Sequence, residues 1–166
     1  MMAFLQSPHG IIFAILGAAL ATLLPGIGSA AGVGLVGEAS AGVTAEDPSK
    51  FSMVLVLQLL PATQGIYGML TSFLLINQLG LLSGNIAEVS VAKGLAYLAS
   101  CLPIAIVGYY SALKQAKTSV AGVSLVAKRP GEMVKGMLFS AMVETYAILA
   151  LLISILGNGG IAKLNI

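Results

Sequence analysis

The chain has 166 residues, of which 58% are hydrophobic and only 8% are charged, and its formal net charge is +2. Its mean hydropathy is +1.00. A soluble domain is about 25% charged, so this composition excludes an ordinary soluble domain and indicates an integral protein of the lipid bilayer. The small net charge does not suggest a nucleic-acid partner.

The first apolar run reads IIFAILGAALATLL and covers residues 11–24. It is similar in length to the hydrophobic part of a secretory signal peptide. However, only His9 precedes it where positive charges would be expected, and apolar residues continue well beyond it. We therefore expect a retained first membrane span over residues 10–42.

This first span contains the glycine-rich stretch GIGSAAGVG. Glycines spaced about one helical turn apart remove side chains from a helix face and let neighbouring membrane helices approach closely. A dinucleotide-binding loop is the competing interpretation, but such a loop follows a strand and none is predicted here. We predict close helix packing at four glycines: Gly26, Gly28, Gly32 and Gly34.

Three further apolar segments follow the first. They cover residues 51–79, 86–127 and 131–156, and polar segments separate the four spans at 44–50, 80–85 and 127–130. Each span is long enough to cross a bilayer as a helix, which needs about 20 residues. The sequence therefore predicts an all-α membrane protein with four transmembrane helices.

Lysine and arginine are distributed unevenly between the ends of these spans. Six lie toward the turns at 44–50 and 127–130, namely Lys50, Lys114, Lys117, Lys128, Arg129 and Lys135. Only Lys93 and Lys163 lie toward the opposite end. Because positive residues concentrate on the cytoplasmic side, we expect a cell-membrane protein with both turns in the cytoplasm and the termini outside.

The two halves of the chain, residues 1–82 and 83–166, have the pattern of a duplicated helical hairpin. When Pro48 is aligned with Pro130, the register is 82 residues, and Thr63 then matches Thr145. In the same register Glu144 matches Ala62, so only one half carries the acid. A duplication of this kind predicts two hairpins with the same orientation in the membrane.

Glu144 lies near the centre of the uninterrupted apolar run 136–156. A charge at that depth costs at least several kcal/mol, so an ionisable residue there indicates a functional site. An ion or proton carrier is the first interpretation. The alternative is an acid that only hydrogen-bonds a neighbouring helix.

Counting residues from each turn estimates the depth of the polar side chains. Glu144 is 14 residues beyond Pro130, which is roughly 21 Å along a helix. The same count places three further polar side chains at this level: Gln115, Thr63 and Gln64. We therefore expect the four side chains to form one cluster.

Pro61 lies beside this predicted cluster. Proline has no N–H, so the carbonyl of Leu57 loses its helical partner and the helix bends. Carbonyls near Leu60 would then be free to face the cluster. A carboxylate, a hydroxyl, amide oxygens and a carbonyl are oxygen ligands of the kind that a hard cation such as Na⁺ prefers. A proton would need only the carboxylate and a hydrogen-bond partner such as Tyr67, so both ions are open.

Three stretches carry a resemblance to a known family: LQLLPATQGIYG (57–68), AMVETYAIL (141–149) and GIGSAAGVGLVGE (26–38). They resemble the proteolipid that forms the rotor ring of bacterial V-type ATPases, also known as subunit K, in particular that of the sodium-pumping kind. The resemblance covers nearly the whole chain. Two departures are Ala62, where a glycine is usual, and Lys114, which immediately precedes Gln115.

The resemblance implies a ring of identical subunits that turns against a static membrane subunit, which supplies an arginine. Central-stalk subunits would link the ring to ATP hydrolysis elsewhere, so this chain would not be an enzyme by itself. Na⁺ would be the transported ion, held at Glu144 by a set of ligands completed by Leu60, Thr63, Gln64 and Gln115. Tyr67 would hydrogen-bond the glutamate. A proton-carrying rotor and a non-rotary pore or scaffold are the alternatives.

Overall fold

The structure is a computed structural model that describes residues 8–165. Long helices dominate it, joined by three short 3-10 segments. In chain order the elements are α2 (Ile11–Glu46), η1 (Pro48–Lys50), α3 (Phe51–Leu59), η2 (Leu60–Ala62), α4 (Thr63–Gln78), α5 (Val91–Lys128), η3 (Pro130–Glu132) and α6 (Met133–Ala162). The predicted halves 1–82 and 83–166 include residues 1–7 and 166, which lie outside the described part.

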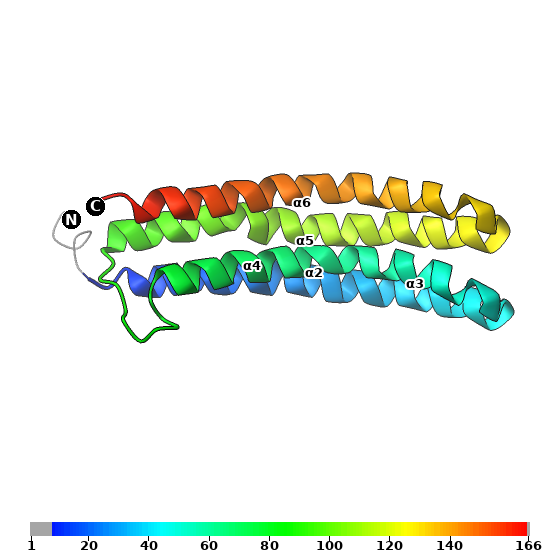
Figure 1. Cartoon of the computed structure of the whole chain (residues 1–166), viewed down its shortest axis with the longest axis horizontal. Helices are drawn as coiled ribbons and strands as arrows, with labels where there is room; N and C mark the ends of the chain where they lie inside the picture. The colour runs from blue at the N-terminus through cyan, green and yellow to red at the C-terminus, as the bar shows by residue number, and fades with distance from the viewer. Residues whose placement is uncertain (1–7, 166) are drawn as a thin grey trace.

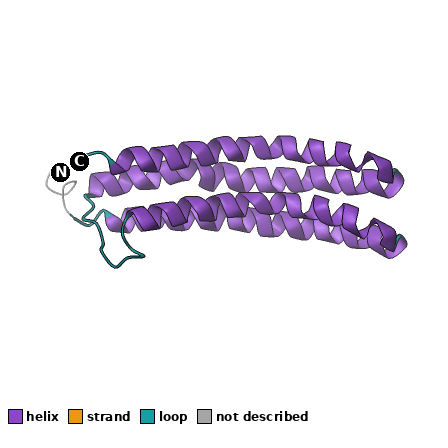
Figure 2. Cartoon of the chain, viewed as in Figure 1, coloured by secondary structure: helices purple, strands orange, loops and turns teal. Residues whose placement is uncertain are grey.

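The helices form two hairpins that lie side by side with the same orientation (Figure 1). The first hairpin combines α2 with the segment α3–η2–α4, and the second combines α5 with α6. Both tight turns lie at one end of the molecule, whereas the α4–α5 connection lies at the other end with the chain termini (Figure 2). Four helical segments are long and apolar enough to cross a membrane, which confirms the predicted all-α class.

Proline and polar side chains set the ends of the helices. At the first turn the Asp47 carboxylate accepts hydrogen bonds from the hydroxyl and the N–H of Ser49, at 2.6 and 3.1 Å. These bonds to the hydroxyl and N–H lower the pKa of the Asp47 carboxyl from its ordinary value. At the opposite end the Ser90 hydroxyl accepts from the Lys93 N–H at 3.1 Å, so α5 begins at Val91 rather than at residue 86.

Two of the predicted packing glycines bring α2 and α5 together. A Cβ atom on Gly28 would lie 2.7 Å from the carbonyl oxygen of Tyr109, and one on Gly32 would lie 3.2 Å from that of Ala112. At Gly28 a side chain would force the two helix backbones apart, and at Gly32 it would leave a tight contact, so both glycines allow the close approach. A Cβ atom on Gly34 would meet no neighbouring group within 4 Å in the single chain, and the Cα of Gly26 lies 3.5 Å from the position of a Cβ on Gly65 of α4.

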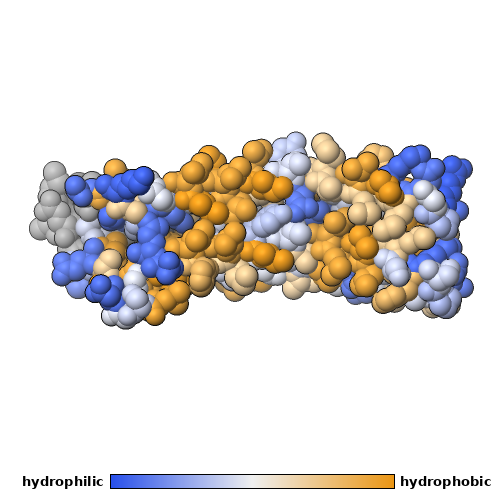
Figure 3. Space-filling view, viewed as in Figure 1, coloured by the Kyte–Doolittle hydropathy of each residue, from blue (hydrophilic) through white to orange (hydrophobic). Residues whose placement is uncertain are grey.

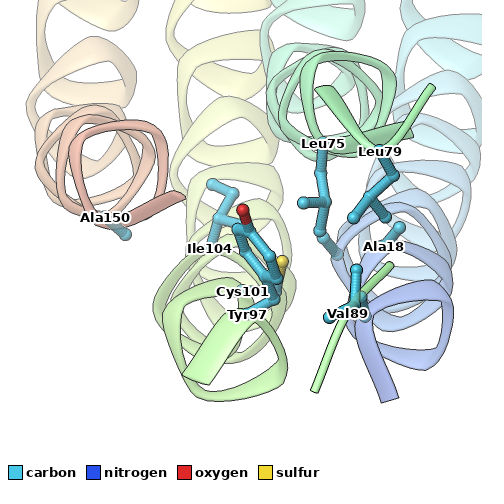
Figure 4. Packing of buried hydrophobic residues seen from close by; sticks show 10 residues of the cluster. Ala18, Leu75, Leu79, Val89, Tyr97, Cys101, Ile104 and Ala150 are labelled. Carbon is cyan, nitrogen blue, oxygen red and sulfur yellow. The ribbon is translucent and has the colours of Figure 1, made fainter. Parts of the chain in front are cut away.

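Buried apolar residues fill the space between the hairpins toward the end that holds the termini. Leu75 of α4 and Leu79, the residue after its end, lie with Ala18 of α2 beside Tyr97 and Ile104 of α5 (Figure 4). On the outside, a hydrophobic band covers most of the length and hydrophilic residues gather at both ends (Figure 3). A small hydrophilic patch interrupts the band near its middle. This surface suits a protein surrounded by lipid.

Candidate ion-binding site

A short 3-10 segment interrupts the second membrane-crossing helix where Pro61 was expected to disturb it. The α-helix α3 stops at Leu59, and α4 starts again at Thr63. The Leu60 carbonyl accepts hydrogen bonds from the N–H and the side-chain hydroxyl of Thr63, the latter at 3.1 Å. The break therefore gathers a main-chain oxygen and a side-chain oxygen on one turn, next to Gln64.

Glu144 lies on α6 and points between the two hairpins. Its Oε1 accepts a hydrogen bond from the Tyr67 hydroxyl of α4 at 2.5 Å. Its Oε2 accepts from Nε2 of Gln115, on α5, at 3.3 Å. Three membrane-crossing segments thus contribute to the environment of one half-buried carboxylate.

A chain of hydrogen bonds joins this carboxylate to the break at Pro61. Gln64 and Gln115 are both fully buried, and Nε2 of Gln64 donates to Oε1 of Gln115 at 2.5 Å. The Thr63 hydroxyl lies 3.4 Å from Oε1 of Gln64 and also donates to the Leu60 carbonyl. The residues predicted at one depth therefore form one connected group, although Glu144 itself bonds only Tyr67 and Gln115 in it.

Ser111 also belongs to this group, Ser29 lies beside it, and neither serine was predicted. Ser111 of α5 accepts from Nε2 of Gln64 at 3.3 Å and donates to the carbonyl of Val143 at 3.1 Å. Ser29 of α2 accepts from the Gly65 N–H at 2.9 Å, at the start of α4. Ser111 is four residues before Gln115 and so shares its helix face, a relation visible in the sequence.

Each residue of this group carries an oxygen atom that could bind a cation, and the group contains a single negative charge. Carboxylate, amide, hydroxyl and carbonyl oxygens suit a hard cation, while thiolate and imidazole ligands would suit a softer metal. Residues 8–165 contain no group of three or more His, Cys, Asp or Glu that could hold a metal ion. One carboxylate balances one positive charge, so the group fits a monovalent cation or a proton.

Comparison with known proteins identifies both halves of the chain. The profile of the ATP synthase C-subunit family matches twice, at residues 16–75 and 98–157. The two matches begin at residues 16 and 98, which is 82 residues apart, the register that aligns Pro48 with Pro130. The predicted duplication is therefore confirmed.

Two curated relatives match nearly the whole chain. The V-type sodium ATPase subunit K of Enterococcus hirae is 47% identical over 157 residues, which cover 94% of this chain and 97% of that protein. The A-type ATP synthase subunit K of Methanocaldococcus jannaschii is 38% identical over 156 residues, covering 93% of this chain and 66% of that protein.

Four membrane-crossing helices, a duplicated hairpin and these relatives define a non-catalytic, ion-translocating membrane subunit of a rotary ATPase. The chain belongs to the ATP synthase C-subunit family. The resemblance to rotor proteolipids seen in the sequence is confirmed. Membership in this family implies assembly into an oligomer that works with other ATPase subunits.

Proposed function

We propose that this chain is the rotor-ring subunit of a V-type ATPase and carries Na⁺ at Glu144. The observation behind this proposal is the hydrogen-bonded group of Tyr67, Gln115 and Gln64 around one carboxylate, within four apolar membrane-crossing helices. The ligands would be the side chains of Glu144, Gln115, Gln64 and Thr63 with the carbonyl of Leu60.

Electrostatics would couple the ion to rotation. An unpaired carboxylate facing lipid is prohibitively costly, so Glu144 travels through the bilayer only when a cation or a proton neutralises it. A static membrane subunit that presents an arginine displaces the ion, and Glu144 then reloads from the other side. Tyr67 and Gln115 hold the carboxylate in place during this cycle.

The repeated hairpins support a ring. Within the chain, α2 of the first hairpin packs against α5 of the second. The surface of α2 in this contact is not the one that corresponds to the surface of α5. Contacts between unlike surfaces of similar units generate closed rings when the rotation closes. Further copies added in the same way would form the ring, which central-stalk subunits connect to ATP hydrolysis.

The name of one relative supports Na⁺ as the transported ion, because that protein is a V-type sodium ATPase subunit. The test uses a carbodiimide, which reacts with protonated carboxyl groups, on the detergent-purified protein. At a fixed pH, added Na⁺ should protect Glu144 from the reagent. Labelling that depends on pH alone and ignores Na⁺ would overturn the sodium proposal in favour of protons.

The orientation in the membrane follows from the uneven distribution of lysine and arginine between the two ends of the spans. We place the turns at 44–50 and 127–130 in the cytoplasm and the termini outside, in the cell membrane. A cysteine introduced at Ser83 should then react with a membrane-impermeant reagent added to whole cells, while one at Ser49 should not. The reverse pattern would invert the orientation.

A further inference from the structure

Three charged side chains inside the membrane-crossing helices have no part in the site around Glu144. Glu38 lies on α2, and Lys114 and Lys117 lie on α5. All three are exposed in the single chain. The two ion pairs within residues 8–165 are Lys50 with Asp47 and Lys135 with Glu132, so these three charges are left without an ionic partner.

The contact between the two hairpins shows which surfaces meet. Gly28 of α2 lies against Tyr109 of α5, and Gly32 lies against Ala112 and Ala116. The two helices run side by side along the bundle (Figure 1), and successive turns of α2 contact successive turns of α5. In this contact the first hairpin uses one surface and the second hairpin uses a different one. Each hairpin also has its own version of the surface that the other uses, and that version stays free.

The 82-residue register identifies the free surfaces. On α2, Ala30 and Gly34 are the equivalents of Ala112 and Ala116. The two alanines of α5 are buried in the hairpin contact, whereas Ala30 and Gly34 are exposed. If a second copy repeated the same contact, its α5 would cover Ala30 and Gly34. On that helix Lys114 would take the place that Gly32 has in the contact within one chain.

The register also places the charges relative to one another. Gly32 of α2 lies against Ala112 and Ala116 of α5, so Val36, one turn further along α2, lies near the level of Val120, one turn beyond Ala116. Val36 and Val120 also contribute to the same hydrophobic cluster. Their equivalents on the free surfaces are Thr118 and Glu38. The repeated contact brings Glu38 of one copy to the level of Thr118 of another, and Lys117 is the next residue along α5.

We propose that Lys117 of each copy forms an ion pair with Glu38 of the neighbouring copy. This inference rests on the ring of the proposed function and names the contact that holds its members in register. Charges of opposite sign on the two free surfaces make the surfaces complementary and disfavour other arrangements. Each charge also gains a partner in a setting where an unpaired charge is costly.

Lys114 fits the same contact. It lines a groove of about 380 Å³ on the free surface of the second hairpin, with Tyr110, Ser111, Val143 and Tyr146 among the other lining residues. In the repeated contact this lysine lies opposite the small residues Ala30 and Gly34, which leave room for its aliphatic stem. In the repeated contact, Ala62 of the second copy would occupy the position that Glu144 has in the contact within one chain. This groove therefore lacks the acid that a cation would need.

Charge reversal tests the pair in the full-length protein. The variants are Lys117→Glu, Glu38→Lys and the double variant, each purified in mild detergent. The readout is the temperature at which the oligomer separates into single chains on gel electrophoresis. We expect each single variant to lower this temperature and the double variant to recover most of the loss. The control is reversal of the ion pair between Glu132 of η3 and Lys135 in the first turn of α6, which should leave the temperature unchanged.

The outcomes separate this inference from the proposed function. If the unmodified protein forms no oligomer, the ring itself fails. A second outcome is that the protein forms an oligomer while the dissociation temperature of the double variant falls by the sum of the two single losses. In that case the proposed ion pair is wrong and the ring stands. A loss in Lys117→Glu alone would instead indicate that Lys117 binds an anionic lipid headgroup, and would also overturn the pair.

A second measurement applies if the charge variants do not assemble. Glu38→Cys and Lys117→Cys are combined in a Cys101→Ser background and treated with a short thiol-specific cross-linker. The expected result is a ladder of covalent dimers and higher multiples, which neither single cysteine gives. A product that remains a single chain, from an oligomer that is intact before treatment, would contradict the proposed contact.

Discussion

The Tyr67 hydroxyl is the group that fixes the position of Glu144. It donates to Oε1 at 2.5 Å, while Gln115 holds the other oxygen at 3.3 Å. A hydrogen bond to a charged group contributes more than one between neutral groups. Tyr67 is not itself in the proposed ligand set, so its effect on ion binding acts through the carboxylate.

The first prediction removes this hydroxyl with Tyr67→Phe. Loss of a group that orients a ligand typically weakens metal affinity by about 10-fold or more. We expect the Na⁺ concentration that half-protects Glu144 from carbodiimide to rise by that factor, with the oligomer intact. Tyr146→Phe is the matched control, because Tyr146 lies two residues from Glu144 and is 66% exposed. Equal effects of the two substitutions would contradict the role given to Tyr67.

Residue counting predicted which side chains share a depth, but not how they connect. It grouped Glu144 with Gln115, Gln64 and Thr63, and the structure joins all four through hydrogen bonds. It missed Ser111, because this serine lies one helical turn away from the counted level, although it shares a helix face with Gln115. The order of the bonds, from Thr63 through both amides to the acid, depends on packing between helices and could not be derived from the sequence.

The interruption at η2 is the element that positions half of the site. Proline is also present within α2 and α5, at Pro25 and Pro103, and neither helix changes to 3-10 geometry there. Proline alone therefore does not explain the break, and the surroundings of Pro61 contribute. The Ser29 hydroxyl, which accepts from the Gly65 N–H, is one such contact.

The second prediction concerns Pro61→Ala. Alanine restores the missing N–H and favours a continuous α-helix, which would shift Thr63 and Gln64 away from the carboxylate. We expect Na⁺ affinity to fall by about 10-fold or more, as when other positioning groups of a metal site are lost. Pro103→Ala in α5 is the control and should have little effect. Unchanged affinity in Pro61→Ala would show that the break is not needed for binding.

The third prediction concerns the close contact of α2 and α5. In Gly28→Ala the new methyl group would lie 2.7 Å from the Tyr109 carbonyl oxygen, so the two hairpins must separate. Overpacking of this kind costs roughly 1–3 kcal/mol. Thermal denaturation in detergent should show the loss. Gly42→Ala, on the same helix but with no atom within 4 Å, should not destabilise the protein, and a similar loss there would point to a general effect of glycine replacement.

Helix ends show where sequence patterns stop being informative. The helix α6 continues to Ala162, although the apolar run ends at Leu156. Asn158, in the extension, is buried and accepts a hydrogen bond from Ser100 of α5. The apolar pattern predicts a span that ends at residue 156, and the extension is missed because the partner of Asn158 on another helix is not visible in a single segment of sequence.

At the scale of the whole molecule, the two hairpins share a fold but not a site. The register pairs Glu144 with Ala62, Gln115 with Val33 and Tyr67 with Leu149. The surface that would repeat the site therefore lacks its acid, its amide and its hydroxyl. The duplication and the four helices could be predicted from the sequence, because both depend on apolar length and on a fixed repeat.

The most direct test of the account is the number of Na⁺ ions bound by each chain. Equilibrium binding of radioactive sodium to the detergent-purified oligomer should saturate at one ion per chain, despite the two repeats. Glu144→Gln should abolish this binding and leave the oligomer assembled. Saturation at two ions per chain, or binding that survives in Glu144→Gln, would contradict the claim that Glu144 is the single carrier.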